Sequence, residues 1–206
     1  MTTVSPAVGY ALWAPTFDST PSPILALEER MLAPWIAEAA PRRTIDVGCG
    51  TGRWTTRIHA IGFDASAEML AAGRGPRAVA EATALPLRDA VADFVLCALT
   101  LGHLRTPVAA MREFARILAP RGTLIVTDFH PAAGHRTFRS GGHLYELENH
   151  PYTLDDLRID EFLLRDSIEA FFGEPERSVF ERAGRPELFD AASRKPAITL
   201  SRWTRV

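Results

Sequence analysis

The sequence predicts an α/β protein built on a doubly wound, mostly parallel sheet of seven strands. Short strand-like segments alternate with helical ones between residues 44 and 128, a rhythm typical of βαβ units with helices on both faces of the sheet. The right-handed crossover of such units makes the sheet doubly wound. The chain has 206 residues, 47% of them hydrophobic, which is enough to bury a core without disulfides.

The first elements are expected to form an N-terminal helical cap over residues 1–40. Residues 1–23 are rich in Pro, Ser and Thr but also contain three aromatic residues, so we expect this segment to pack on the rest of the chain. Residues 24–39 place leucine and isoleucine on one helical stripe, with glutamates outside it. Pro34 is expected to bend or break that helix.

Residues 41–130 are expected to be the core that binds a cofactor. Apolar runs of strand length alternate here with amphipathic segments of helical spacing. The expected strands span residues 44–47, 60–63, 78–80, 93–98 and 122–128. Helices are expected from a glycine-rich turn to about residue 58, over 66–73 and over 108–118.

After the fifth strand the rhythm changes, and residues 131–166 are expected to form a lid over the substrate. The stretch 130–150 holds four of the chain's six histidines. Thr153 and Asp156 resemble a capping box, which predicts a helix running to about Leu164.

Residues 167–206 are expected to close the sheet with two strands, over 167–172 and 197–204. A charged, loop-rich connection separates them. Its run of Glu and Arg residues at 174–187 is expected to be a solvated surface. Cap, core, lid and closing strands together predict one domain spanning residues 1–206.

Composition excludes several classes of protein. There are 25 acidic and 23 basic side chains, for a net charge of -2, whereas a general nucleic-acid binder carries a positive face. The two cysteines lack metal-ligand spacing, and no apolar run reaches the roughly 20 residues of a membrane span. The N-terminus has no basic stretch followed by a long apolar one, as a secretory signal would. We expect a cytoplasmic monomer or homodimer.

The segment from Ile45 to Gly52, IDVGCGTG, leaves a strand and enters a helix. Its alternate glycines let the backbone turn tightly and approach a ligand closely. The helix N-terminus that follows offers free N–H groups to a carboxylate or phosphate. The dinucleotide pattern G-x-G-x-x-G is not met, because Arg53 stands at the place of its third glycine. Another nucleotide ligand stays open as an alternative.

Asp64 ends the second expected strand, sixteen residues after Gly48. An acidic side chain at this position accepts hydrogen bonds from the two hydroxyls of a ribose. The simpler alternative is a helix cap, because Ser66 and Glu68 follow it. The spacing from the glycine-rich turn favours ribose binding.

Five segments in a fixed order resemble the class I S-adenosylmethionine-dependent methyltransferases, in the small-molecule branch of ubiquinone and menaquinone biosynthesis. They are DVGCGTGRW, IGFDASAEML, EATALPL, ADFVLCALTLGHL and AMREFARILAPRGTLIVTDFHP. The resemblance runs from about Tyr10 to Pro131. It implies a Rossmann-like sheet whose last strand is antiparallel, with S-adenosylmethionine as cofactor and S-adenosylhomocysteine as product.

The resemblance also implies a set of cofactor-binding residues. Asp46 and the glycine backbone would hold the methionine end, Asp64 the ribose, and the residues after Asp64 the adenine. Aromatic residues of the N-terminal segment would close over the cofactor. The full set is Tyr10, Trp13, Asp46, Gly48, Cys49, Gly50, Gly52, Asp64, Ala65, Met69, Glu81, Ala82 and Leu99. Cys49 itself is expected to be a packing residue rather than a nucleophile, because no base stands beside it.

Four residues are candidates for catalysis. His103 and His130 follow the fourth and fifth strands, at the edge where open α/β sheets bind their ligands. His143 and Tyr145 lie in the segment that the resembling family uses to cover substrate, and a strand there would place both on one face. Each could act as a general base or orient the acceptor. No metal is expected, because the spacing of the histidines is generic.

The predicted function is transfer of a methyl group from S-adenosylmethionine to an O, N or C atom of a small molecule. One alternative keeps the cofactor in an enzyme of non-methylating, cyclase-like chemistry, and another is a non-catalytic subunit that retains the fold. A nucleic-acid acceptor is disfavoured, because the residues after the fourth strand, Ala98 to Leu101, do not form the Asn/Asp-Pro-Pro-aromatic tetrapeptide of amino-methylating enzymes.

Overall fold

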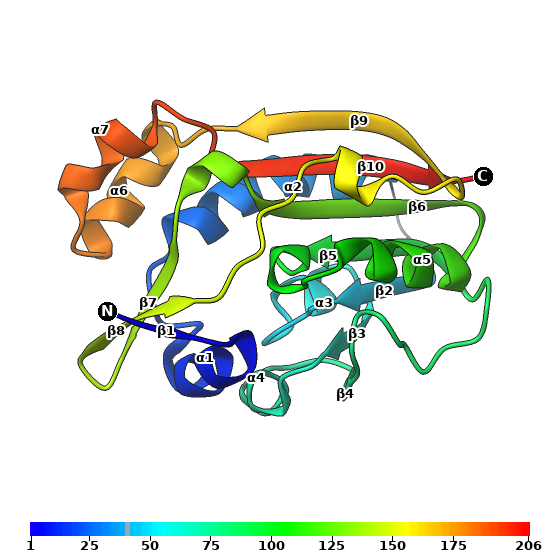
Figure 1. Ribbon diagram of the computed structural model, residues 1–206, viewed down its shortest axis with the longest axis horizontal. Coiled ribbons are helices and arrows are strands. Elements are labelled where there is room, and N and C mark those ends of the chain that lie inside the picture. The colour runs from blue at the N-terminus through cyan, green and yellow to red at the C-terminus, as the bar shows by residue number, and fades with distance from the viewer. Residues whose placement is uncertain (40–41) are drawn as a thin grey trace.

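The computed structural model describes residues 1–39 and 42–206, and a seven-stranded sheet forms its centre (Figure 1). From one edge to the other, its strands are β4 (Arg77–Val79), β3 (Ile61–Asp64), β2 (Thr44–Val47), β5 (Ala92–Ala98), β6 (Leu118–Phe129), β10 (Ile198–Arg205) and β9 (Phe162–Ala170). Neighbouring strands are parallel, except that β10 runs antiparallel to both β6 and β9. The predicted sheet, with its last strand antiparallel, is confirmed.

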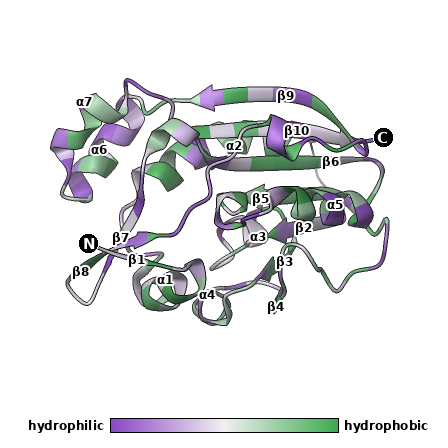
Figure 2. Ribbon diagram, viewed as in Figure 1, coloured by the Kyte–Doolittle hydropathy of each residue, from purple (hydrophilic) through white to green (hydrophobic). Residues whose placement is uncertain are grey.

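Helices cover both faces of this sheet. On one face α5 (Pro107–Ile117) packs in a core with Val95, and on the other α2 (Pro23–Ala39) and α3 (Arg53–Arg57) pack in a core with Phe94. Adjacent residues of β5 thus enter opposite cores, because side chains alternate along a strand. Figure 2 shows the hydrophobic residues gathered on the central strands β5 and β6.

A second, three-stranded sheet lies beside the first one. The N-terminal strand β1 (Thr2–Val4) pairs with β8 (His143–Leu147), which forms a hairpin with β7 (Arg136–Ser140). Helix α1 (Pro6–Trp13) packs against this sheet so closely that a Cβ on its Gly9 would lie 2.1 Å from Leu147 Cδ2. The predicted cap and the predicted lid are therefore joined by strand pairing, which the sequence did not indicate.

The predicted helix from Thr153 to about Leu164 is wrong. Thr153 and Asp156 do make the expected contact, with the Thr153 N–H donating to an Asp156 carboxylate oxygen at 2.7 Å. Only a short turn of 3₁₀ helix, Asp155–Leu157, follows it. Strand β9 then begins at Phe162, because its pairing along β10 from Phe162 to Ala170 outweighs the local helix signal.

The connection between the closing strands also differs from the prediction. It contains α6 (Glu174–Arg182) and α7 (Phe189–Ala192) instead of loops alone. The charged run is not wholly solvated, because Glu176 is 1% exposed. Its carboxylate accepts hydrogen bonds from Arg30 at 2.8 and 3.0 Å, which joins α6 to α2.

The helix predicted over residues 24–39 is confirmed, and Pro34 lies inside it without ending it. Proline is tolerated there because its position faces solvent and neighbouring turns still pair. Within residues 1–39 and 42–206, no helix has both the length and the apolar character that a bilayer crossing requires.

Candidate functional site

A cavity of about 750 Å³ opens at the edge of the sheet where the parallel strands end. Its walls come from the glycine-rich turn after β2, the end of β3, helix α1, strand β7 and the end of α6. Open α/β sheets bind their ligands at this edge. The cavity therefore lies where the sequence placed the cofactor.

The glycine-rich turn has a backbone that only glycine fits. Gly48 has φ of +71°, and a Cβ there would lie 2.0 Å from Thr100 Oγ1 and 2.7 Å from Thr100 Cβ. The backbone N–H groups of Gly48 and Cys49 both donate to the carbonyl of Phe63, at 2.7 and 3.1 Å. The turn is thus tied to the end of β3 and closely packed on the segment after β5.

Asp64 joins the turn to the next helix and faces the cavity. Its carboxylate accepts hydrogen bonds from the N–H of Gly50 at 2.7 Å and from the N–H of Ser66 at 2.8 Å. Burial raises the pKa of Asp64, and these two N–H groups oppose the rise. Each oxygen keeps a further lone pair for a ligand hydroxyl.

The cap of the following helix is Ser66, not Asp64. The Ser66 hydroxyl accepts a hydrogen bond from the N–H of Met69 at 3.2 Å, at the start of α4 (Ala67–Ala72). This geometry assigns the capping role to Ser66 and leaves Asp64 to orient the turn. The alternative of Asp64 as a helix cap is therefore wrong.

Two buried titratable groups belong to the turn and to the strand before it. Asp46 accepts a hydrogen bond from the Thr55 hydroxyl at 2.6 Å, and desolvation raises its pKa to about 6. Desolvation together with Asp46 and Asp64 raises the pKa of Cys49 to about 12. The Cys49 thiol is therefore neutral near pH 7, as expected of a packing residue.

Every predicted cofactor residue lines the cavity except Gly52. Gly52 lies at the N-terminus of α3 with φ of +85°, and a Cβ there would lie 2.4 Å from the carbonyl oxygen of Arg74. It shapes the turn from behind. This close approach of the Arg74 carbonyl oxygen explains why the sequence pattern has glycine at position 52.

The four catalytic candidates are separated by the fold. His103 lines the cavity, whereas His130, His143 and Tyr145 lie outside its lining. The Nε2 atom of His130 is 3.2 Å from a carboxylate oxygen of Glu169. His143 and Tyr145 do share a face of β8, with ring centroids 6.4 Å apart. Leu147 of the same strand lines the cavity, but these two side chains do not.

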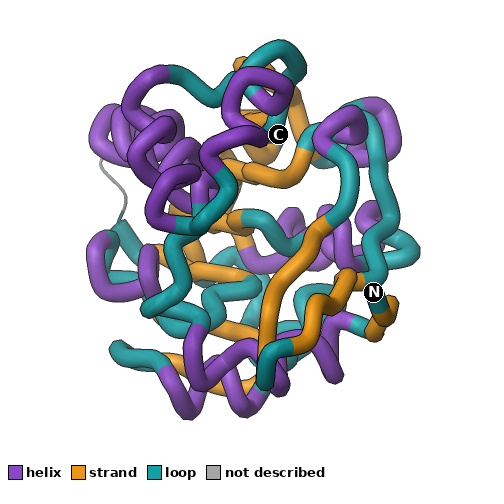
Figure 3. The backbone as a smooth tube through the Cα atoms, turned by 90° about the vertical axis from the view of Figure 1, so that its left-hand side faces the viewer, coloured by secondary structure: helices purple, strands orange, loops and turns teal. Residues whose placement is uncertain are grey.

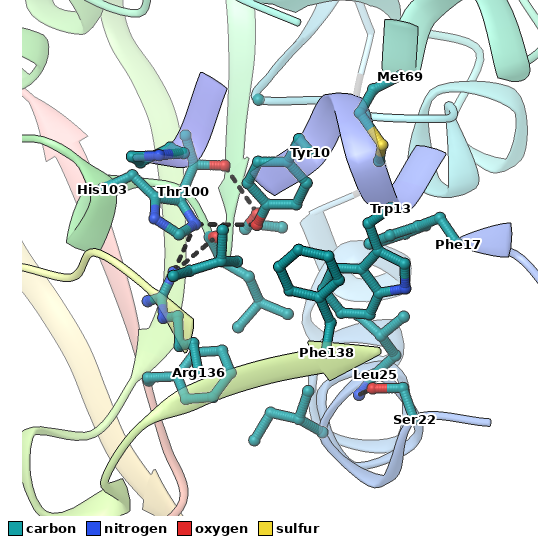
Figure 4. A pocket seen from close by; sticks show the side chains of 18 of the residues that line it. Tyr10, Trp13, Phe17, Ser22, Leu25, Met69, Thr100, His103, Arg136 and Phe138 are labelled. Carbon is teal, nitrogen blue, oxygen red and sulfur yellow. Dashed lines mark hydrogen bonds between the residues drawn. The ribbon is translucent and has the colours of Figure 1, made fainter. Parts of the chain in front are cut away.

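A polar network that the sequence did not indicate surrounds His103 (Figure 4). The Nε2 atom of His103 lies 2.9 Å from the Tyr10 hydroxyl and 2.9 Å from Nη1 of Arg136. A guanidinium only donates, so Nε2 is the acceptor and the ring proton is on Nδ1. Nδ1 faces the carbonyl oxygen of Glu148 at 3.4 Å.

The two rings of this network stay neutral near pH 7. Burial, with the neighbouring Arg136 charge, lowers the pKa of His103 to about 4. Burial raises the pKa of Tyr10 to about 12. The Tyr10 hydroxyl is therefore a donor to His103 across the physiological range.

Arg136 forms a buried ion pair with Asp128 at the end of β6. The second Asp128 oxygen accepts from the N–H of Gly102 at 2.6 Å and from the Tyr152 hydroxyl at 3.2 Å. The guanidinium also lies over the ring of Phe129 at 4.1 Å. These contacts fasten the β7–β8 hairpin to the large sheet.

Three hydrogen-bond donors on residues of the cavity wall have no partner among residues 1–39 and 42–206. They are Nε1 of Trp13, Nη1 of Arg53 and Nε of Arg136. The Trp13 ring is stacked on Phe138 with centroids 4.9 Å apart. A buried donor without an acceptor is rare in native proteins, and these atoms therefore fit a site that takes a polar ligand.

Within the described ranges, no group of three or more His, Cys, Asp or Glu side chains is arranged to hold a metal ion. The chain has helices on both faces of a mostly parallel sheet, a glycine turn after one strand and an acid at the end of the next. This arrangement is typical of Rossmann-like proteins that bind nucleosides.

Comparison with known proteins narrows this class. Residues 45–126 match the family model described as a methyltransferase domain. An uncharacterised methyltransferase of Mycobacterium tuberculosis is 41% identical over 100 residues, which are 44% of this chain and 41% of that protein. The chain thus spans about two fifths of the length of this curated relative.

Solved structures share the fold over most of the chain. An S-adenosylmethionine-dependent methyltransferase from Mesorhizobium loti has a TM-score of 0.66 at 21% identity, covering 89% of this chain and 100% of that one. The cyclase SpnF has a TM-score of 0.72 at 17% identity, covering 100% and 99%. Residues 45–126 are thus similar to a methyltransferase domain, and the chain shares the fold of these solved structures.

Proposed function

We propose that this protein transfers a methyl group from S-adenosylmethionine to an O, N or C atom of a small molecule, with residues 1–206 acting as one domain. The observation that carries the proposal is the cavity itself. The glycine turn and Asp64 of the matched methyltransferase domain line it together with Tyr10 and Trp13 of the N-terminal helix.

The residues of the cavity fit the proposed cofactor. Asp64 would accept from the ribose hydroxyls, and the backbone of the Gly48 turn, with Asp46, would hold the methionine end. Ala65, Met69, Glu81, Ala82 and Leu99 would surround the adenine, and Cys49, Gly50 and Gly52 would shape the turn. The unpartnered donors of Trp13 and Arg53 would find acceptors on the ligand.

Bound S-adenosylmethionine would supply a methyl group that its sulfonium already activates. The main task of the chain is then to position the acceptor, which contributes several kcal/mol in reactions of this kind. A pKa of about 4 makes His103 a weak base. We therefore assign His103 an orienting role through Tyr10 and Arg136, and we place His130, His143 and Tyr145 outside the reacting centre.

The direct test is binding of S-adenosylhomocysteine, measured by calorimetry. Asp64→Asn replaces an acceptor of two backbone N–H groups by an amide that cannot accept at both positions, so we expect affinity to fall about tenfold or more. Asp93→Asn is the control, because Asp93 pairs with Arg43 at the surface. Absence of binding to the wild-type protein would favour a non-catalytic subunit.

A second candidate is cofactor-dependent chemistry without methyl transfer. It is favoured by the cyclase SpnF, whose structure covers the whole of this chain. Transfer of label from the cofactor methyl group to a product separates the two candidates. The net charge of -2 supports a small acceptor over a nucleic acid in both.

A further inference from the structure

The charged side chains that line the cavity are unevenly distributed along it. The acidic ones, Asp46, Asp64 and Glu81, lie on or just after strands β2, β3 and β4, and Arg53 lines the wall at the same end. At the other end Arg139, Arg182 and others of positive charge line the wall. The second end is therefore chemically distinct from the nucleoside end.

Three arginines reach this second end from two separate elements. Arg139 lies on β7, Arg182 lies in the last turn of α6, and Arg185 follows that helix. Gly184, with φ of +67°, turns the chain there, and the N–H of Arg185 donates to the carbonyl oxygen of Phe180 at 2.9 Å. Helices α6 and α7 lie above the β7–β8 hairpin in two perpendicular views (Figures 1 and 3).

None of these three guanidinium groups is neutralised by a carboxylate of residues 1–39 or 42–206. By contrast Arg177, on the same helix as Arg182, pairs with Glu174 at 2.9 Å and lies over Phe189. Guanidinium groups without a carboxylate partner offer forked donors suited to carboxylate and phosphate. The helix dipole favours a cation in the last turn of α6, which accounts for Arg182 but not for Arg139 or Arg185.

Apolar side chains accompany the three arginines. Phe172 and Phe180 line the same part of the cavity, with ring centroids 4.9 Å apart at an edge-to-face angle. Leu188 lines it too, although its side chain is 44% exposed. The stacked pair of Trp13 and Phe138 continues this apolar wall towards the nucleoside end.

We propose that the methyl acceptor is a small molecule with an apolar body and an anionic group, a carboxylate or a phosphate, which Arg139, Arg182 and Arg185 bind. The proposal rests on the proposed function, because it places the acceptor in the part of the cavity that the cofactor would leave free. The anion serves as an anchor, and the apolar body lies along Phe172 and Phe180.

The test uses two fluorescent probes with the same aromatic body. Anilinonaphthalene sulfonate carries an anion, and phenylnaphthylamine is its neutral counterpart. We expect the double variant Arg182→Gln/Arg185→Gln to weaken sulfonate binding about tenfold or more, as loss of charge-assisted hydrogen bonds would. Binding of the neutral probe should change less than about twofold. Arg194→Gln is the matched control, because Arg194 lies in the same region but does not line the cavity.

Competition by octanoate, octyl phosphate and octanol distinguishes the anions. Octanoate and octyl phosphate should each displace the sulfonate from the wild-type protein better than octanol does. The anion that competes more strongly identifies the group that the site prefers. Equal loss of both probes in the double variant, or no loss of the sulfonate, would overturn the proposal. S-adenosylhomocysteine affinity is measured on the same variants. If the wild-type protein does not bind it, the proposed function fails while the probe result still reports on the anion site.

Discussion

The two ends of the cavity are built by different physical means. At the nucleoside end, the conformation of the backbone determines the shape of the site. Its hydrogen-bond partners are close in the chain: the N–H of Gly50 donates to Asp64, 14 residues away. At the acceptor end, strand β7 carries both Arg139 and Arg136, and Arg136 belongs to the network around His103. Side chains of this network meet across the whole molecule, as when Tyr10 bonds to His103, 93 residues away. The first end is a local property of two βα turns. The second exists only once the N-terminal helix, the hairpin and the sheet have come together.

This difference predicts how each end responds to substitution. A change at the nucleoside end should act on ligand affinity, because it alters one rigid turn. A change in the network of the acceptor end should act first on stability, because buried charges hold separate elements together. The four substitutions below test this division, beginning with the largest expected effect.

Replacing Arg136 by Met should give the largest loss of stability. It leaves the Asp128 carboxylate, 2% exposed, without its guanidinium partner. Breaking a buried ion pair from one side costs about 3–5 kcal/mol. Urea denaturation followed by circular dichroism measures the free energy of unfolding. The double variant Asp128→Asn/Arg136→Met should recover part of the loss, since it leaves no isolated charge.

The control for Arg136 is another arginine of the same region. Arg105 pairs with Glu148 at 2.8 Å, but its side chain is 79% exposed. Arg105→Met should change stability by less than about 1 kcal/mol. If Arg136→Met and Arg105→Met lowered the free energy of unfolding equally, the buried pair would contribute no more to holding the hairpin on the sheet than an exposed pair does.

Replacing Gly48 by Ala should have the largest effect on ligand affinity. The new methyl group would meet Thr100 at Cβ, an atom that cannot rotate away, and the backbone at +71° disfavours any side chain. We expect the turn to move and affinity for S-adenosylhomocysteine to fall about 100-fold, or about 2.7 kcal/mol. Calorimetry measures the change.

Gly141→Ala separates backbone strain from loss of the site. Gly141 also has positive φ, +55°, but nothing lies within 4 Å of its Cβ position. We expect this variant to lose about 1 kcal/mol of stability with unchanged affinity. If Gly48→Ala behaved in the same way, close packing of the turn on Thr100 would be irrelevant to the site.

The same division explains what the sequence could predict. The sheet, the turn and Asp64 were predictable because their residue types are dictated within a few positions, by glycine conformation and by strand periodicity. Even there, the sequence could not decide whether Asp64 or Ser66 caps the following helix, since both residue types favour caps. The hydrogen bond from the Met69 N–H to the Ser66 hydroxyl decides it.

The acceptor end was less predictable because its contacts depend on distant pairing. Nothing near Arg136 indicates that it meets Asp128, and the small sheet joins residues 2–4 to residues 136–147. The helix predicted after Thr153 failed for the same reason: pairing of Phe162 and its neighbours with β10 decides their conformation.

Protonation of His103 gives a third test, through pH. Its pKa is lowered from 6.5 to about 4 on folding, so the folded protein binds this proton more weakly than the unfolded chain. The stability that neutral His103 supplies is complete above pH 6.5 and is lost as pH falls towards 4. Between these limits the wild-type protein should lose about 2 kcal/mol more than His103→Gln.

Denaturation series at several pH values measure this difference. The comparison cancels the opposite contribution of Asp46, whose raised pKa makes protonation favour the folded state, because Asp46 is present in both proteins. Parallel pH curves for the wild-type protein and the variant would contradict a neutral, buried His103.

Tyr10→Phe should have the smallest effect and is the sharpest test of whether the two ends communicate. It removes only the hydroxyl that donates to His103 at 2.9 Å, which is worth about 1 kcal/mol. Because Tyr10 also lines the cavity, we expect affinity for S-adenosylhomocysteine to fall about fivefold. Ser140→Ala removes a different hydroxyl, which donates to the carbonyl oxygen of Leu12 at 2.8 Å and joins the same hairpin to α1 away from the cavity. It should lose similar stability and keep its affinity. If both variants kept full affinity, the N-terminal helix would be a structural cap only, and the nucleoside end would be complete without it.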